Sequence, residues 1–244
     1  MIRALFVIAV MFAYVFVVGT PLLLYSVLAG ESQALYDAGV WGCKFILWLA
    51  GVRLEVHGRE RIPPNGALVF MSNHQGNCDP PAVISILPPV AALVKEGLFR
   101  VPVLGRAMRV CGFIPVDRAN RERATEAVEH GVEALRAGKS LLVFPEGTRS
   151  RDGRLLPFKR GVFVMAIKAQ VPIVPISVSG SGKIMQKGKF ALRPGLVRIT
   201  VHEAIPTAGQ GLDDRGQVME RVRQAILSGL TAEEMPLTPV LLTR

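Results

Sequence analysis

The chain carries a histidine and an aspartate at a spacing that suits acid–base chemistry. His74 follows Asn73 directly after an apolar run, and Asp79 stands five positions beyond the histidine. A carboxylate that binds one imidazole nitrogen fixes the tautomer of the ring and leaves the other nitrogen free to take a proton. We therefore expect His74 to be a general base oriented by Asp79. The spacing also fits a simpler alternative, in which His74 is a hydrogen-bonded loop residue and Asp79 only caps a helix.

A second polar segment, residues 145–150 (PEGTRS), follows another apolar run. A strand that ends in a glycine-containing turn would present Glu146 and Arg149 at the surface, where a guanidinium group can bind an anion. Residues 149–160 contain five basic side chains and one acidic one. The basic residues are Arg149, Arg151, Arg154, Lys159 and Arg160, and the acidic residue is Asp152. We expect an anion site here; a solvated turn with an exposed ion pair is the alternative.

Strands and helices must hold these two segments together. Apolar runs of strand length occur at residues 67–72, 110–116, 140–144, 173–178 and 197–201. Helical patterns begin at Asp79, with Pro80 in the first turn, and cover residues 121–137, 158–169 and 212–230. Alternation of strands and helices predicts an α/β fold with a mixed central sheet flanked by helices on both faces. Both polar segments would then lie at carboxyl ends of strands, where catalytic residues commonly lie.

The first thirty residues form a different kind of segment. No charged side chain occurs from residue 4 to residue 30, a run of 27 residues that exceeds the roughly 18 needed for a membrane-helix candidate. The apolar run is also longer than the core of a secretory signal peptide, which disfavours that alternative. Residues 19–21 (GTP) interrupt the run, because proline removes a helical hydrogen bond. The segment therefore either spans a bilayer as one kinked helix or dips in and turns back.

A shorter apolar stretch follows at residues 38–50, with Trp41 and Trp48 on either side of Lys44. Tryptophans with a snorkelling lysine are typical of a helix at a membrane interface, although a buried helix packed on the main domain fits as well. We predict that residues 1–50 form a two-helix membrane anchor and that residues 51–244 form the α/β domain.

Composition limits the class of protein. Half of the 244 residues are hydrophobic, and the mean hydropathy of +0.36 excludes a disordered chain. With 29 basic and 19 acidic residues the net charge is +10, which suits anionic lipid, nucleic acid or phosphorylated substrates. The three cysteines, Cys43, Cys78 and Cys111, are widely spaced, so we expect reduced thiols and neither disulfides nor a zinc site.

Four ordered segments resemble the motif blocks of the glycerolipid acyltransferases. These are the HxxxxD spacing of residues 74–79, residues 112–118 (GFIPVDR), residues 144–150 (FPEGTRS) and residues 174–176 (VPI). In size and N-terminal pattern the chain is similar to the bacterial 1-acyl-sn-glycerol-3-phosphate acyltransferases. The resemblance implies transfer of a fatty acyl group from a thioester to the sn-2 hydroxyl of lysophosphatidic acid, which yields phosphatidic acid.

The resemblance also implies roles for site residues. His74 and Asp79 would be catalytic, and Arg118, Arg149 and Lys95 would bind the acceptor phosphate. Substrate binding or structural support would fall to Asn73, Glu146, Gly147 and Thr148. Attack on a thioester builds an oxyanion, for which backbone N–H groups around Gly147 are candidate donors. We expect neither a metal nor a cofactor; acyl-CoA or acyl carrier protein would be the co-substrate.

The expected partners are lysophosphatidic acid, the acyl donor and membrane lipids, but not nucleic acid, because aromatic residues are few among the basic ones. The expected location is the cell inner or cytoplasmic membrane, with the catalytic domain on the cytosolic face. One alternative keeps the chemistry and changes the acceptor to glycerol 3-phosphate, another lysophospholipid or a lyso-aminolipid. A more distant alternative is a non-catalytic binder of anionic lipids.

Overall fold

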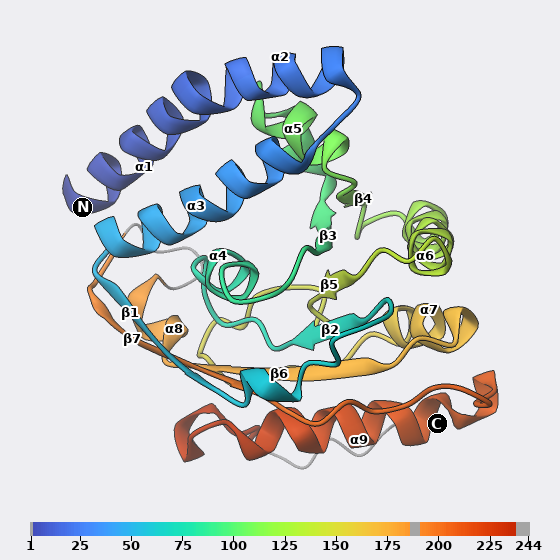
Figure 1. The fold of residues 1–244 in the computed structure, drawn as a ribbon. Coiled ribbons are helices and arrows are strands. Elements are labelled where there is room, and N and C mark those ends of the chain that lie inside the picture. Colours follow the sequence, from blue (N-terminus) through green and yellow to red (C-terminus); the bar gives the residue numbers. More distant parts are fainter. Residues whose placement is uncertain (1, 186–190, 238–244) are drawn as a thin grey trace.

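A seven-stranded sheet with strand order β1-β7-β6-β2-β5-β3-β4 forms the centre of the molecule in the computed structural model, which describes residues 2–185 and 191–237 (Figure 1). The strands are β1 (Val52–His57), β2 (Val69–Ser72), β3 (Ala91–Lys95), β4 (Ile114–Val116), β5 (Leu141–Val143), β6 (Ile173–Ser179) and β7 (Gly195–Val201). Neighbouring strands are parallel except β6 and β7, which are antiparallel. The predicted mixed sheet is therefore confirmed.

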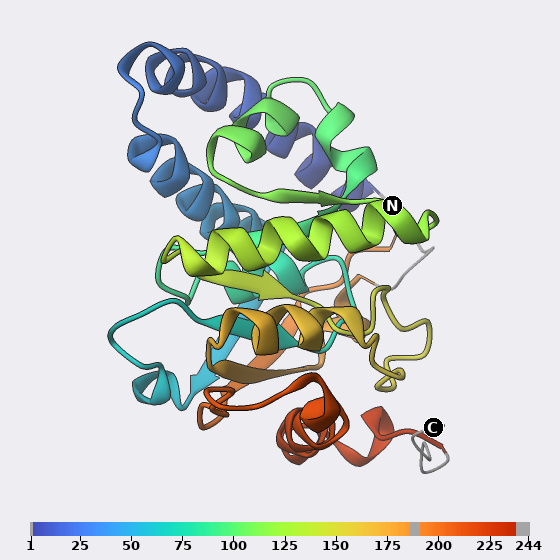
Figure 2. The same cartoon turned by 90° about the vertical axis from the view of Figure 1, so that its right-hand side faces the viewer.

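Helices cover both faces of the sheet, as predicted. Those that the argument uses are α1 (Ile2–Tyr14), α2 (Thr20–Ala29), α3 (Gln33–Leu49), α4 (Asp79–Ile84), α5 (Leu104–Val110), α6 (Arg121–Arg136), α7 (Gly161–Ala169), α8 (Ser181–Ile184) and α9 (Arg215–Ser228). Figure 2 shows α6 and α7 side by side across one face. On the other face α4 and α8 pack against the sheet, and α3 covers α4.

The strands are apolar on both sides because both sides are covered. On β2, Val69 and Met71 belong to the core under α6, α7 and α9, whereas Phe70 belongs to the core under α4. Each of these three side chains is fully buried. Strand β2 is therefore packed between two hydrophobic cores. This packing makes the carboxyl end of β2 a rigid support for His74.

The N-terminal segment is one long helix rather than a helix that turns back. It runs from Ile2 to Ala29, and a π-helical turn, Val15–Gly19, joins α1 to α2. The wider turn immediately precedes Pro21, which has no N–H to donate to the carbonyl four residues earlier. This helix is long and apolar enough to cross a membrane, judged by length and composition.

Helix α3 contacts both α1–α2 and the domain. Its Leu47 lies in the core against the sheet, and the hydroxyl of Tyr36 accepts a hydrogen bond of 2.9 Å from the backbone N–H of Val90. Its outward side exposes Trp41 by 56% and Trp48 by 71%. The sequence left open whether this helix packs on the domain or lies at a membrane interface. In the structure one face of the helix packs on the domain, and the other face exposes the two tryptophans.

Several predicted elements need correction. The run at residues 110–116 is not one strand: α5 ends at Val110, the backbone N–H of Phe113 closes the helix on the carbonyl of Met108, and β4 covers only Ile114–Val116. Gly112 has φ +80° in this turn, a conformation that glycine adopts without strain. Strands β1 and β3 were not predicted; in the structure they are held by pairing with β7 and with β5.

Candidate active site

The predicted site residues meet at one edge of the sheet. Strands β2, β5, β3 and β4 are mutually parallel neighbours, so their carboxyl ends open on the same edge. His74 lies two residues after β2, Glu146 three residues after β5, and Arg118 two residues after β4, while Lys95 is the last residue of β3. The sheet thus gathers segments that are distant in sequence.

His74 and Asp79 form a buried hydrogen-bonded pair. The Nδ1 atom of His74 lies 2.7 Å from Oδ2 of Asp79, and the two side chains are 10% and 0% exposed. The same Oδ2 accepts hydrogen bonds from the backbone N–H groups of Gln75 at 2.6 Å and Gly76 at 2.8 Å. When Nδ1 donates its proton to Asp79, the lone pair of His74 is left on Nε2, which is the form that a general base requires.

Asp79 does not cap helix α4 in the predicted way. The N-cap position belongs to Cys78, and Asp79 is the first helical residue. Its carboxylate turns back to the loop that carries His74 and binds the amides of Gln75 and Gly76. The prediction thus placed Asp79 at the right end of the helix, but the amides that it binds belong to the preceding loop rather than to the first turn.

The imidazole is also held by an aromatic ring. The centroids of His74 and Phe144 are 4.3 Å apart, with an angle of 29° between the planes. Phe144 is the residue that leads from β5 into the PEGTRS segment. Stacking restricts rotation of the imidazole about its side-chain bonds, so the direction of Nε2 is defined by Asp79 on one atom and Phe144 on one face.

Glu146 ties the two motif loops together. One carboxyl oxygen accepts a hydrogen bond of 2.6 Å from the backbone N–H of His74. The other accepts a hydrogen bond of 2.9 Å from the backbone N–H of Leu156. In return, the backbone N–H of Ser150 donates to the carbonyl of His74 at 2.9 Å. Glu146 is 2% exposed. The expectation of an exposed Glu146 was therefore wrong.

Burial dominates the electrostatics of Glu146. It raises the pKa of this carboxyl to about 8, although the N–H donors of Leu156 and His74 pull the pKa down. The negative charge of Asp79 adds to the rise, and the guanidinium of Arg223 on α9 opposes it. Arg223 itself is 6% exposed, and its guanidinium lies 5.5 Å from the ring centroid of Phe158. No sequence signal pointed to Arg223 or Leu156.

Two predicted phosphate ligands adjoin the PEGTRS turn. The guanidinium of Arg118 donates a hydrogen bond to the carbonyl of Gly147. Partial desolvation and then the positive charge of Arg149 lower the pKa of Arg118. Arg118 and Arg149 thus lie close enough to interact electrostatically, and two neighbouring guanidinium groups suit an anion.

The remaining predicted residues take different positions. Lys95 is exposed, and its register partner on β4 is Val116, two residues before Arg118. Thr148 is exposed in the turn. Asn73 is buried, and its amide pairs with the backbone of Val178 on β6, donating at 2.8 Å and accepting at 2.7 Å. Asn73 therefore continues the ladder between β2 and β6 and supports the loop.

The expected oxyanion donor is already engaged. The backbone N–H of Gly147 donates a hydrogen bond of 3.0 Å to the carbonyl of Phe144 and closes the turn. The φ angle of Gly147 is +70°. A left-handed conformation at this position favours glycine, which explains the residue type. Gly147 thus shapes the turn and offers its carbonyl to Arg118, and its own N–H is not available to an oxyanion.

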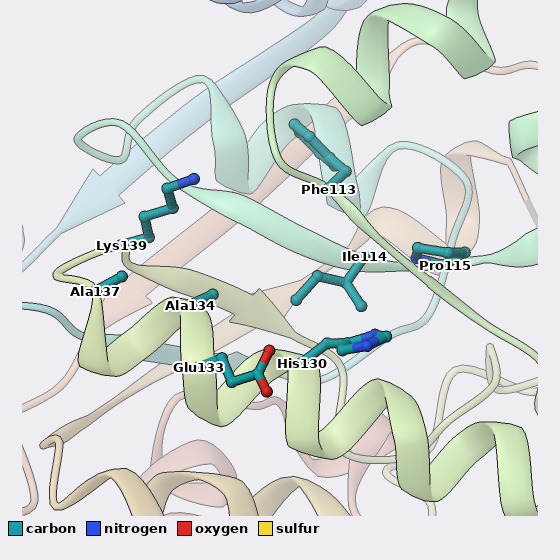
Figure 3. Close-up of a pocket in the computed structure, with 8 residues that line it drawn as sticks. All are labelled: Phe113, Ile114, Pro115, His130, Glu133, Ala134, Ala137 and Lys139. Carbon is teal, nitrogen blue, oxygen red and sulfur yellow. The ribbon is translucent and has the colours of Figure 1, made fainter.

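Other parts of the described surface do not add to this site. A cavity of about 480 Å³ lies between β4 and α6 and is lined by none of the predicted site residues (Figure 3). It includes His130 and Glu133 of α6 and Lys139 of the following loop. Within residues 2–185 and 191–237, no three His, Cys, Asp or Glu side chains cluster in a way that could hold a metal ion.

A family model described as Acyltransferase matches residues 53–179, the part of the chain that holds the His–Asp pair and the FPEGTRS turn. A chloroplastic 1-acyl-sn-glycerol-3-phosphate acyltransferase of Brassica napus is 38% identical over 155 residues, covering 63% of this chain and 45% of that protein. A putative 1-acyl-sn-glycerol-3-phosphate acyltransferase of Caenorhabditis elegans is 35% identical over 82% of this chain and 70% of its own length. The chain belongs to the 1-acyl-sn-glycerol-3-phosphate acyltransferase family.

A solved structure extends the likeness over nearly the whole chain. The 1-acyl-sn-glycerophosphate acyltransferase PlsC from Thermotoga maritima superimposes with a TM-score of 0.81 at 26% identity. The match covers 93% of this chain and 94% of that chain. It therefore includes the N-terminal helices as well as the catalytic domain. By contrast, this chain spans less than half of the Brassica protein.

Proposed function

We propose that this protein transfers a fatty acyl group from an acyl thioester to the sn-2 hydroxyl of 1-acyl-sn-glycerol 3-phosphate and forms phosphatidic acid. One observation carries the proposal: a hydrogen-bonded His74–Asp79 pair shares a sheet edge with Arg118 and Arg149. The pair supplies a base for an alcohol, and the two cations suit a phosphate monoester. Both functions are needed at once for acylation of a phosphorylated acceptor.

The chain's own residues account for the proton transfers. Nε2 of His74 takes the proton of the sn-2 hydroxyl as the hydroxyl oxygen attacks the thioester carbonyl, and Asp79 stabilises the resulting imidazolium. When the tetrahedral intermediate collapses, the carbon–sulfur bond breaks and the thiolate leaves with the proton from Nε2. The products are the ester and a free thiol, and His74 returns to its starting form.

Arg118, Arg149 and Lys95 bind the acceptor phosphate in this proposal. A guanidinium can donate two parallel hydrogen bonds to phosphate, and an ammonium adds a further charge. Phosphate bound there would fix the distance from its oxygens to the sn-2 hydroxyl. The acceptor would then present this hydroxyl to His74 rather than any other group.

The N-terminal helices hold the enzyme on a membrane in this proposal. The long helix lies along the body of the protein: Gly19 faces Val103 beside α5, and Arg3 reaches the carbonyl of Leu49 at the end of α3. An upright helix would draw charged residues of α3, such as Asp37 and Lys44, toward the hydrocarbon at a high cost. Immersion of the apolar side in one leaflet avoids this cost.

Further aspects of the proposal concern location and origin. The acyl donor is made in the cytosol, so the catalytic domain faces the cytosolic side of the inner or cytoplasmic membrane. The match to the Thermotoga maritima protein covers nearly all of both chains, and this supports a bacterial origin for the enzyme. Membrane lipids and the two substrates are the proposed partners, and nucleic acid is not one.

Thiol release during acylation tests the proposal. Wild-type protein should release thiol from acyl-CoA or acyl carrier protein only when lysophosphatidic acid is added, and His74→Ala should lower kcat by about 10²–10⁴-fold. His130→Ala, an exposed histidine on α6, is the matched control and should keep wild-type activity. Substantial turnover by His74→Ala would remove the base assignment. Turnover only with glycerol 3-phosphate or another lysolipid would change the acceptor.

A further inference from the structure

A second cavity adjoins the His74 loop on the side away from Arg118. Its volume is about 340 Å³, and its walls come from Gln75, from the turn around Gly153, from the segment after β6 and from the C-terminal residues Glu233 and Glu234. In the sheet, β2 with its His74 loop lies between β6 on one side and β5, β3 and β4 on the other. Arg118, which follows β4, thus lies on the side of His74 away from β6, whereas this cavity adjoins the segment after β6.

The floor of this cavity contains an unsatisfied hydrogen-bond donor. Gln75 is 2% exposed, and its Oε1 accepts a hydrogen bond of 3.3 Å from the hydroxyl of Ser181. Its Nε2 faces Glu234, whose pKa it helps to lower, yet this atom makes no hydrogen bond with the described residues. A buried N–H group without a partner is costly, so Nε2 suits a ligand carbonyl.

Glu234, which Nε2 of Gln75 faces, is fixed in place by other donors. Oε2 accepts from the hydroxyl of Ser179 at 2.7 Å and from the backbone N–H of Thr231 at 2.9 Å, and Oε1 accepts from the backbone N–H of Gly180 at 2.8 Å. Glu234 is 7% exposed. The segment around Glu234 is therefore bonded to the end of β6 and forms a fixed wall of the cavity.

Glycines let a ligand approach the backbone in this cavity. A Cβ atom added at Gly153 would meet nothing within 4 Å. One added at Gly182 would lie 3.5 Å from Cβ of Gln75 and 3.6 Å from Cα of Gly153, so a larger side chain would fill the space between them. Exposed peptide groups at such positions can donate to and accept from an amide-containing chain.

One cation at the rim of the cavity has no acidic partner among the residues that the structure describes. Lys183 pairs with Glu233 at 2.7 Å, and Asp152 accepts from the hydroxyl of Ser150 at 2.8 Å. Arg193 is exposed and forms no ion pair with any residue that the structure describes. A phosphate at the mouth would find this guanidinium available.

We propose that this cavity binds the phosphopantetheine arm of the acyl donor, an inference that rests on the proposed function. The arm is a chain with two amides, a thioester at one end and a phosphate at the other. Its amides match Gln75 and the glycine backbone, and its phosphate matches Arg193. The two substrates then reach His74 from opposite sides of β2, which brings the thioester carbonyl to the acceptor hydroxyl without competition for Arg118 and Arg149.

Two variants test this binding site. Gly182 does not have a left-handed φ, so its backbone can accept a leucine. Gly182→Leu should raise the KM for acyl-CoA by roughly tenfold or more, because the side chain fills the cavity and prevents hydrogen bonds to the arm. Arg193→Ala should raise that KM by about two- to fivefold, as expected for an exposed charge pair. Neither should alter the KM for lysophosphatidic acid. Arg53→Ala, an exposed arginine on β1, is the control and should leave both values unchanged.

The choice of donor separates the parts of the arm. S-acylpantetheine, which has no phosphate, should be used equally well by wild type and Arg193→Ala but poorly by Gly182→Leu. Parallel assays with acyl-CoA and acyl carrier protein show which source of the arm the enzyme uses. A thermal melt checks that Gly182→Leu folds, and if it does not, Arg193→Ala with and without the donor phosphate decides the question.

The outcomes distinguish this inference from the proposed function. If wild type acylates lysophosphatidic acid but neither variant changes the donor KM, the cavity is not the donor site. An increase in the acceptor KM instead would also overturn the inference. If wild type does not acylate lysophosphatidic acid, the proposed function fails; calorimetric binding of CoA to wild type, weakened in Gly182→Leu, would still support the cavity. Equal CoA binding by both proteins, or none, would reject it.

Discussion

At the scale of single residues, Glu146 connects acid–base chemistry to loop structure. Its carboxyl group accepts a hydrogen bond from the backbone N–H of His74, the proposed base, so it influences this residue without contacting the imidazole. Removal from water favours the neutral form of a carboxyl group, whereas two backbone donors favour the charged form. Because burial is the larger effect, the pKa of Glu146 rises to about 8. Its protonation state therefore changes in the physiological range.

The raised pKa predicts a specific dependence of stability on pH. Glu146 holds its proton in the folded state up to about pH 8, but in the unfolded chain only up to its ordinary pKa of 4.5. This stabilising contribution is complete below pH 4.5 and is lost as the pH rises through 8. Glu146→Gln cannot titrate, so the variant should show a flatter plot of melting temperature against pH between 5 and 9. Identical slopes for variant and wild type would contradict the raised pKa.

Residue types and spacing predicted part of this site. His74, Asp79, Arg118 and Arg149 are polar residues that follow strands, and parallel strands bring such positions to one edge. The burial of Glu146 was not predictable, because it depends on the backbone N–H of Leu156, ten residues away in a loop. The use of the Gly147 N–H within its own turn was likewise hidden from the sequence.

At the scale of elements, a side chain replaces backbone pairing at the end of β2. The amide of Asn73 binds both the N–H and the carbonyl of Val178, as a backbone residue of a strand would. The β2–β6 ladder is thereby extended by one residue just before the chain turns into the His74 loop. This link fixes the end of β2 and therefore the position of the loop that carries His74.

Removal of this amide should destabilise the protein measurably. Asn73→Ala leaves the buried N–H and carbonyl of Val178 without partners, at a cost of about 2–4 kcal/mol in the free energy of unfolding. Asn65→Ala, at an exposed turn position, is the control and should change stability by less than about 0.5 kcal/mol. Denaturant unfolding followed by circular dichroism measures both. Equal stability of Asn73→Ala and wild type would show that water or a local shift replaces the amide.

One helix was predicted closely, whereas two strands were missed. The helix at residues 121–137 agrees with α6 within one residue because its apolar positions recur with helical spacing. Strands β1 and β3 were missed, although β3 ends at Lys95, a predicted site residue. Short strands owe their structure to cross-strand partners such as Leu141, which single-sequence patterns do not reveal.

At the scale of the whole molecule, most of the large exposed apolar side chains among the described residues belong to the N-terminal helices. Helices α1, α2 and α3 lie together at the top of Figure 1, and α9 lies at the opposite end. Ring stacking links Tyr14, Trp41, Phe45 and Trp48 into one aromatic series across α1 and α3, with centroids 5.2–6.3 Å apart. An exposed apolar surface of this kind marks contact with another apolar medium, here the proposed bilayer.

The aromatic series should govern membrane binding. Trp41→Glu combined with Trp48→Glu places two charges on the proposed bilayer face and should release most of the protein from vesicles in a flotation assay. Both tryptophans are largely exposed, so the fold should tolerate the change. Leu212→Glu, an exposed leucine beside α9, is the control and should still float. Full retention of the double variant on vesicles would contradict a membrane role for this face.

The sheet's outermost strand has a consequence for biosynthesis. β1 pairs only with β7, and Val52 meets Gly195, so the partner of β1 is among the last parts of the domain to leave the ribosome. At 5–20 residues per second, roughly 7–30 s separate the emergence of these two strands. During this interval the apolar helices are already outside the tunnel while the sheet remains open. The nascent chain would then reach the lipid surface first and complete its fold there, which protects an unpaired strand edge from aggregation.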